Sequence, residues 1–183
     1  MRALDDILRI VACAFPAAGV KALLVGGFAV NHYGYTRNTL DLDLMIAEGD
    51  EERVRRIMTE EGFTNRSETS NAIFYQHPDG GLRLDVLTVD ETTMAALLAN
   101  AQPAGLAGVT LAVPALRDVL AMKLFAVTQG HPARADRDLP DIAYLTVLND
   151  LNLERDIKPL CDRFATAEIY KEIVRRVTIL RGS

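Results

Sequence analysis

Residues 40–46 begin with leucine and aspartate in strict alternation, and this stretch constrains the fold most strongly. Successive side chains of a β-strand point to opposite faces, so the pattern predicts a half-buried strand. The leucines form its apolar face, and Asp41 and Asp43 share the other face. The strand therefore belongs to a sheet whose apolar face packs against the protein core. The two carboxylates lie on the other face of that sheet.

Helix-like and strand-like patterns alternate around this strand. Apolar residues recur every three or four positions in residues 2–15, which predicts an amphipathic helix. A short apolar strand at residues 22–25 stops at Gly26 and Gly27, and residues 28–33 favour a helix. The elements expected next are a helix capped by Asp50 and ended near Gly62, strands at residues 72–76 and 82–89 joined by a hairpin turn at residues 77–81, a helix capped by Asp90, and a strand at residues 109–113.

Only helical patterns follow residue 115. Helices are expected at residues 115–129, 137–149, 153–164 and 166–181, with turn breaks at residues 130–132 and near Asn152. Pro140 is expected in the first turn of the second of these helices, with Asp138 as its cap. We therefore predict an α/β (α+β) fold with a mixed sheet in a first domain, residues 1–114, and a helical C-terminal subdomain, residues 115–183.

The net charge of -5 gives no global basic excess of the kind that nucleic-acid-binding proteins usually have. Residues 1–115 carry 9 basic and 15 acidic side chains, and residues 116–183 carry 11 and 10. A contact with nucleic acid would have to be local. A basic group near the C-terminus is the one candidate, and a solvated helix face explains it as well; it comprises Lys171, Arg175, Arg176 and Arg181.

Neither membrane insertion nor secretion is indicated. No run reaches the roughly 18 apolar residues of a membrane-spanning helix. The first residues carry two aspartates before the apolar positions, which argues against a secretory signal. Cys13 and Cys161 lie far apart without metal-ligand spacing, so neither a zinc site nor a disulfide framework is predicted. We expect a cytoplasmic protein with no membrane partner.

Asp41 and Asp43 are the first candidates for chemistry. Carboxylates at alternate strand positions lie roughly 7 Å apart and repel each other in a partly desolvated site. A cation between them relieves this repulsion, and Mg²⁺ suits carboxylate oxygens and substrate phosphates. The alternative is an exposed edge strand whose polar face is solvated. A third carboxylate, Asp85, stands between Leu84 and Val86 on another expected strand.

The glycine pair precedes the acidic strand closely, since Gly27 stands fourteen residues before Asp41. Backbone N–H groups at a glycine turn that opens a helix favour phosphate, although a tight turn alone also explains Gly26 and Gly27. Arg37 and Thr39 add a guanidinium and a hydroxyl just before the acidic strand.

Together these features resemble the DNA polymerase beta-like nucleotidyltransferase superfamily, in which a glycine-rich turn precedes a DxD strand and a third acidic residue follows on a later strand. The stretch LLVGGFAVNHYGYTRNTLDLDLMI is most similar to small bacterial AbiEii-type toxin nucleotidyltransferases and their uncharacterised relatives. A looser match covers AMKLFAVTQGHPARADRDLPDIAYL. The matching residues are Gly26, Gly27, Asp41, Asp43, Asp85, Lys123, Arg137, Asp138 and Asp141.

The resemblance implies a mixed-sheet nucleotidyltransferase fold and a reaction with two Mg²⁺ ions, or Mn²⁺ in their place. Asp41, Asp43 and Asp85 are implied as the metal ligands and catalytic residues, with Asp85 also activating the attacking hydroxyl. The implied nucleotide-binding residues are Gly26, Gly27, Arg37, Thr39 and Lys123. Gly27 departs from the many members that have serine there, so a hydroxyl on the phosphate is missing. The structural alternative for Lys123 is an ordinary lysine at the edge of a helix.

The implied partners are an NTP, an acceptor hydroxyl on RNA, protein or a small molecule, with a tRNA end among the candidates, and an antitoxin protein. A non-catalytic nucleotide- or partner-binding protein with the same fold is the alternative. The sequence assigns no role to Arg137, Asp138 or Asp141.

Overall fold

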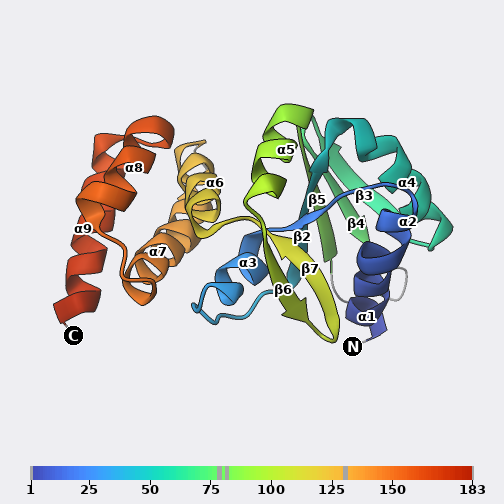
Figure 1. Ribbon diagram of the computed structural model, residues 1–183, viewed down its shortest axis with the longest axis horizontal. Helices are drawn as coiled ribbons and strands as arrows, with labels where there is room; N and C mark the ends of the chain where they lie inside the picture. Colours follow the sequence, from blue (N-terminus) through green and yellow to red (C-terminus); the bar gives the residue numbers. More distant parts are fainter. Residues whose placement is uncertain (1, 78–79, 81–82, 130–131, 183) are drawn as a thin grey trace. The chain divides into compact units, whose positions relative to one another are not determined.

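The computed structural model describes residues 2–77, 80, 83–129 and 132–182. It contains one mixed sheet of seven strands over these ranges, in the order β3-β4-β5-β2-β1-β7-β6. Helices precede, interrupt and follow the strands along the chain (Figure 1). The predicted mixed α/β fold is therefore confirmed.

The chain divides into two compact units. The sheet unit comprises Met1–Ala29 and Asn38–Ala115, and the helical unit comprises Val30–Arg37 and Leu116–Ser183. A short segment near the start of the chain thus belongs to the helical unit. The predicted domain division after residue 114 takes no account of that segment, and it stays a prediction.

The central strands β2 and β5 run parallel and form the longest register in the sheet. Strand β1 pairs antiparallel with β2 and parallel with β7, while β4 pairs antiparallel with β5 as the expected hairpin. Residues 78, 79 and 81 of that hairpin turn and residue 82 lie outside the described residues. The strands are β1 (Leu23–Leu24), β2 (Asp41–Ala47), β3 (Thr64–Thr69), β4 (Ala72–Gln76), β5 (Arg83–Val89), β6 (Gln102–Leu106) and β7 (Val109–Val113).

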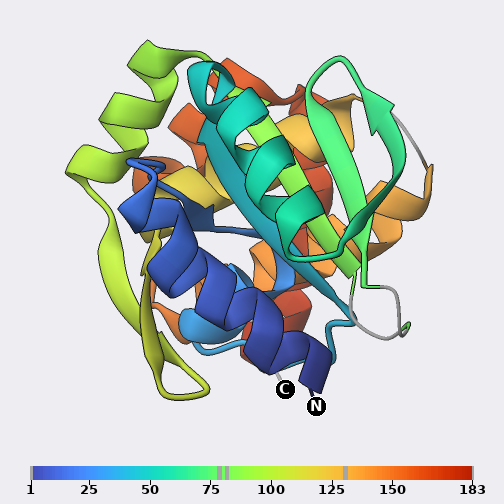
Figure 2. The ribbon, with the colours of Figure 1, turned by 90° about the vertical axis from the view of Figure 1, so that its right-hand side faces the viewer.

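Helices α1 and α4 of the sheet unit lie over one face of the sheet (Figure 2). The expected N-terminal helix is a continuous helical run, in which a π-helical turn separates α1 from α2. Its buried residues include Ile7, Leu8, Val11 and Phe15. Asp90 accepts a hydrogen bond from Thr93 N at 2.9 Å and caps α5, as predicted. The helices are α1 (Arg2–Arg9), α2 (Phe15–Ala17), α3 (Gly26–His32), α4 (Glu51–Glu60) and α5 (Glu91–Ala99).

The helical unit packs α6 against α7, and α7 against α9 (Figure 1). Its core includes Leu124, Ile142, Leu145 and Ile173, all of them fully buried. The predicted succession of helices is therefore confirmed. The helices are α6 (Leu116–Thr128), α7 (Pro132–Leu148), a π-helical turn (Leu153–Ile157), α8 (Lys158–Phe164) and α9 (Ala167–Gly182).

One predicted cap is confirmed in position and the other is wrong. Asp50 is the N-cap residue of α4, as predicted, although its side chain makes no capping hydrogen bond and pairs with Arg53. Asp138 and Pro140 do not begin a helix, since α7 already starts at Pro132 and contains both residues in its interior. The turn expected just before α7 includes residues 130 and 131, which lie outside the described residues.

Within the described ranges, the structure has no helix that is both long enough and apolar enough to cross a membrane.

Candidate active site

The register of β2 on β5 sets the geometry of the site. Asp43 is the direct neighbour of Asp85 across the two parallel strands, and Asp41 is the direct neighbour of Arg83. Paired residues of neighbouring strands point to the same face, roughly 4.8 Å apart at the backbone. Asp41, Asp43 and Asp85 therefore share one face of the sheet, as the sequence predicts.

The opposite face of the same strands is apolar. Leu42, Leu44, Leu84 and Val86 alternate with the acidic residues and are fully buried. The central strands therefore cannot shift register by one residue without placing carboxylates in this core. Burial of these leucines and this valine is what holds the carboxylate face in place.

Arg83 lies between two of the three carboxylates. Its Nε donates to Asp85 Oδ1 at 2.8 Å, and its Nη2 donates both to Asp85 Oδ2 at 3.2 Å and to Asp41 Oδ2 at 2.9 Å. The hydrogen bond with Asp85 raises the pKa of Arg83, and the charges of Asp85, Asp41 and Asp43 add to this shift. The guanidinium therefore acts as a counter-cation for the whole carboxylate face.

Exposure differs along this face. The side chain of Asp85 is 10% exposed, that of Asp41 28%, and that of Arg83 44%. Asp85 thus lies in the driest part of the site, where an uncompensated charge costs most. The side chain of Arg83 is the most exposed of the three.

Gly26 approaches the carboxylate face from the turn between β1 and α3. Its backbone has a φ of 60°, and a Cβ placed there would lie 2.0 Å from Asp43 Oδ2. The backbone N–H of Val25, the preceding residue, donates to Asp43 O at 2.9 Å. Only glycine therefore fits at position 26, for both conformational and steric reasons.

The other residues predicted near this turn take different positions. Gly27 is the buried second residue of α3. The Thr39 hydroxyl donates to the backbone carbonyl of Asp41 at 3.1 Å. The structure therefore brings Asp41, Asp43, Asp85 and Gly26 together within the sheet unit.

Lys123 and Arg37 lie in the helical unit, paired with carboxylates of α7. Lys123 Nζ lies 2.8 Å from Asp138 Oδ1 and 2.6 Å from Asp141 Oδ2. The Arg37 guanidinium grips Asp141 with two hydrogen bonds, from Nε at 2.8 Å and Nη2 at 2.9 Å. Lys123, Asp138 and Asp141 are each at most 7% exposed, whereas Arg137 is exposed. Phosphate binding by Lys123 or Arg37 would have to compete with these ion pairs.

Several contacts hold residues 33–37 against α7 and Asn149, the residue that follows it. The rings of Tyr35 and Tyr144 stack with centroids 4.2 Å apart. Asn149 Nδ2 donates to the carbonyl of Tyr33 at 3.0 Å. Together with the two hydrogen bonds from Arg37 to Asp141, these contacts hold the segment that precedes the acidic strand in the helical unit.

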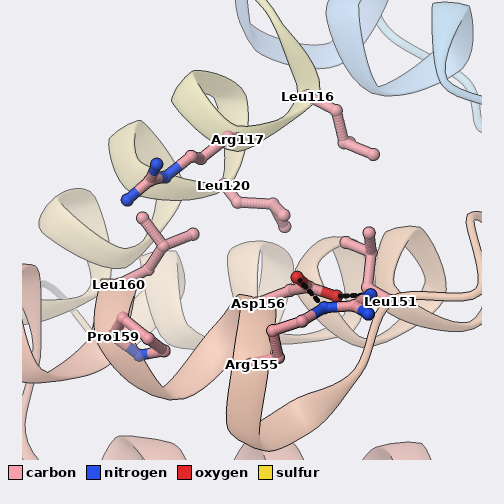
Figure 3. Close-up of a pocket in the computed structure, with 8 residues that line it drawn as sticks. All are labelled: Leu116, Arg117, Leu120, Leu151, Arg155, Asp156, Pro159 and Leu160. Atoms are coloured by element: carbon pink, nitrogen blue, oxygen red, sulfur yellow. Dashed lines mark hydrogen bonds and ion pairs between the residues drawn. The ribbon is translucent and has the colours of Figure 1, made fainter.

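The helical unit also contains a pocket of about 390 Å³ (Figure 3). Leucine and proline side chains form most of its wall, and Arg155 is held by Asp156 at 2.9 Å beside them. This ion pair neutralises Asp156. Arg117 adds a second basic side chain to the wall of the pocket. The lining residues are Leu116, Arg117, Leu120, Leu151, Arg155, Asp156, Pro159 and Leu160.

The carboxylate face fits a divalent metal in chemistry, because its donors are carboxylate oxygens. Among the described residues, however, no group of three or more His, Cys, Asp or Glu side chains is arranged to hold a metal ion. The Arg83 guanidinium instead binds oxygen atoms of both Asp41 and Asp85.

Arg83 is the site residue that the sequence analysis missed. The signal was present, because an arginine two positions before Asp85 on an expected strand must share its face. The buried partners of Lys123 had a weaker signal, the three-residue spacing of Asp138 and Asp141, which places both on one side of a helix.

No protein-family model matches the chain, and no curated protein matches it in sequence. Solved structures do match. The antibiotic-resistance factor ANT(2″)-Ia has a TM-score of 0.59 at 13% identity, over 100% of this chain and 94% of that chain. LnuA, a lincosamide antibiotic adenylyltransferase solved with lincomycin, has a TM-score of 0.57 at 14% identity, over 79% and 96%.

A nucleotidyltransferase-like protein from Paracoccidioides brasiliensis has a TM-score of 0.54 at 16% identity, over 97% of this chain and 89% of that chain. The structural similarity establishes a shared fold. Because the identities are low, the reaction has to be argued from the site. The chain therefore has the nucleotidyltransferase fold.

Proposed function

We propose that this protein is a metal-dependent nucleotidyltransferase that moves a nucleoside monophosphate from an NTP to a hydroxyl group of an acceptor. The observation that carries the proposal is the register of β2 on β5, which sets three carboxylates on one face. The approach of Gly26 to Asp43 supports it, because a glycine turn beside a carboxylate face gives a triphosphate access to backbone donors. The shared fold agrees with it.

In this proposal Asp41, Asp43 and Asp85 hold Mg²⁺ or Mn²⁺ through their carboxylate oxygens. The bound metal supplies charge neutralisation at the transferring and leaving phosphate groups. Asp85 accepts the proton of the acceptor hydroxyl. The hydroxyl oxygen then bonds to the α-phosphorus of the NTP, the bond from that phosphorus to the bridging oxygen breaks, and pyrophosphate leaves.

Gly26 and Gly27 orient the triphosphate with backbone N–H groups, and Thr39 contributes from the start of the acidic strand. Arg37 and Lys123 stay nucleotide-binding candidates only if a phosphate displaces a carboxylate partner from each. The buried position of Lys123 favours a structural role for its side chain.

Incubation with each α-labelled NTP, Mg²⁺ and a cell extract tests the proposal. We expect label to enter RNA, protein or a small molecule, with release of pyrophosphate. Asp43→Asn should abolish both signals, because it removes a carboxylate without changing side-chain size. The matched control is Asp90→Asn in the same unit, which should retain activity because asparagine also caps a helix. Equal activity of the wild type and Asp43→Asn would refute the proposal.

The acceptor is proposed as a small-molecule, protein or RNA hydroxyl, and the fold neighbours include enzymes solved with lincomycin and with adenylyl-tobramycin. The acidic balance of the sheet unit disfavours a long nucleic acid, while a short end such as that of tRNA remains compatible. Separating the labelled products by class distinguishes these acceptors.

We further propose, from the resemblance to AbiEii-type proteins, that the enzyme acts as a toxin restrained by an antitoxin protein. Expression should then arrest growth, and Asp43→Ala should restore it. Growth arrest by Asp43→Ala as well would exclude nucleotidyl transfer as the cause.

One observation favours the binding-only alternative, namely that Arg83 already forms ion pairs with two of the carboxylates. A binding protein would release heat of association with an NTP and produce no pyrophosphate. Calorimetry with each NTP, combined with a pyrophosphate assay, separates the two functions.

A further inference from the structure

Arg83 occupies a distinctive place on the carboxylate face. It neighbours Asp41 across the strands, shares its own strand with Asp85, and hydrogen-bonds both. Three carboxylates and one guanidinium leave a net charge of two negative units on this face. The carboxylates thus outnumber the guanidinium, and this excess of negative charge attracts further positive charge.

We propose that Arg83 is an internal counter-cation that competes with divalent metal for Asp41 and Asp85, so that metal binds only as the guanidinium leaves these carboxylates. This inference rests on the proposed function and concerns the order of events at its site. Arg83 is a positioning residue in this account, because it acts through the two carboxylates.

The competition follows from the contacts. Arg83 Nη2 donates to one oxygen of Asp41 and one of Asp85, and Nε donates to the second oxygen of Asp85. Both oxygens of Asp85 are thus engaged, and a metal ion bound to Asp85 would meet the guanidinium charge at close range. Like charges in a partly desolvated site repel strongly, so the two cations exclude each other.

The same contacts give Arg83 a role without metal. Asp85 is 10% exposed at its side chain and lies directly beside Asp43 on the next strand. Without a cation these carboxylates would repel each other in a site poorly screened by water. Arg83 therefore stabilises the metal-free protein while it weakens metal binding, and these two effects have opposite signs.

The exposure of the Arg83 side chain allows a metal ion to replace its guanidinium at the carboxylates. Arg83 is 44% exposed at its side chain, so its guanidinium can swing to solvent at little cost in hydration. Asp41 and Asp85 are fixed by the buried apolar residues next to them on the central strands. The mobile member of the site is the cation, and the ligands stay in place.

Calorimetry of Mn²⁺ binding, without nucleotide and at fixed ionic strength, tests the proposal on the full chain. Arg83→Gln should bind Mn²⁺ roughly 1.5- to fivefold more tightly than the wild type, the factor that corresponds to loss of one partly exposed ion pair. Arg83→Lys should fall between them, because it keeps the charge and loses the two-pronged contact.

Arg55→Gln is the matched control. Arg55 also belongs to the sheet unit, bonds two carboxylates, Glu51 and Glu68, and is 32% exposed. Its loss should leave Mn²⁺ affinity unchanged. Equal affinity gains in Arg83→Gln and Arg55→Gln would mean that overall charge, and no local competition, controls binding.

Thermal melting provides a second readout. Arg83→Gln should melt below the wild type in EDTA and should regain the difference in saturating Mn²⁺, whereas any deficit of Arg55→Gln should persist in both. Wild-type affinity equal to that of Arg83→Gln would overturn this inference alone. Absence of Mn²⁺ binding in both proteins would overturn the inference together with the metal-dependent function.

Discussion

The ammonium of Lys123 lies 2.6 Å from Oδ2 of Asp141, and both side chains are almost completely buried. Lys123→Met would leave Asp138 without its cationic hydrogen-bond donor in the core. We expect a loss of about 3–5 kcal/mol in the free energy of unfolding, because breaking a buried pair strands a charge. Urea unfolding at pH 7 measures it.

Lys158→Met is the control for this change, since Lys158 pairs with Asp162 at an exposed position. Its loss should lower the free energy of unfolding far less than the loss of Lys123, because a solvent-exposed ion pair contributes little. An unchanged unfolding free energy for Lys123→Met, joined with a raised KM for the NTP, would instead assign Lys123 to phosphate binding.

Removal of Asp43 should abolish nucleotide transfer and leave the metal-free fold intact or slightly more stable. Asp43→Ala takes away the carboxylate beside Asp85, so repulsion on this face falls. Asp41→Ala should gain less stability, because Arg83 loses a partner worth about 0.2–1 kcal/mol. Melting temperatures in EDTA check both variants, and a large drop in either would identify a structural carboxylate.

Gly26→Ala should disturb the site more than a glycine replacement elsewhere. A left-handed backbone with a Cβ costs about 1–2 kcal/mol, and the contact with Asp43 adds about 1–3 kcal/mol. Gly19→Ala isolates the first contribution, because Gly19 has a φ of 73° and nothing within 4 Å of its Cβ position. Equal unfolding free energies for the two variants would show that Asp43 yields easily.

Glu172 should contribute acid-sensitive stability to α9. Its hydrogen bond with Arg175, supported by Arg176, lowers the pKa of Glu172 to about 2. A carboxylate with a lowered pKa stabilises the fold above its unfolded pKa of about 4.3, and loses this effect as the pH falls through about 2. Glu172→Gln should therefore cost less than about 1 kcal/mol at pH 7 and nothing near pH 2.

Urea unfolding of the wild type and Glu172→Gln at pH 7, 4 and 2 checks this sign. A difference that grew toward low pH would contradict the ion pairs as its source.

Hydrophobic alternation predicted the centre of the sheet but not its two ends. Strands β2 and β5 bury one face, so their sequences carry a regular pattern that fixes register. The two strands that sequence reasoning missed, β3 and β6, are the two edges of the sheet. The first is almost entirely polar, and the second contains Pro103 and Gly105, residues that edge strands tolerate.

Local rules misplaced the start of α7 because tertiary contacts decided it. Pro140 usually marks a helix start, and Asp138 before it fits a cap. The carboxylate of Asp138 instead pairs with Lys123 across α6 and α7, which favours helix through both positions. The candidate site was predicted because its acids alternate with leucines, whereas no spacing rule links Arg83 to Asp41, 42 positions apart.

The chain passes between its two compact units three times, after Ala29, Arg37 and Ala115. A truncated protein ending at Ala115 would retain Val30–Arg37 yet lose every α7 group that anchors it, from the Tyr144 ring to the Asp141 carboxylate. Val30–Arg37 would then connect the glycine turn to the acidic strand without the contacts that hold this segment in place. Removal of the C-terminal helices therefore does not separate the two units. A recombinant protein that takes these helices from a relative would also have to take Val30–Arg37 from it.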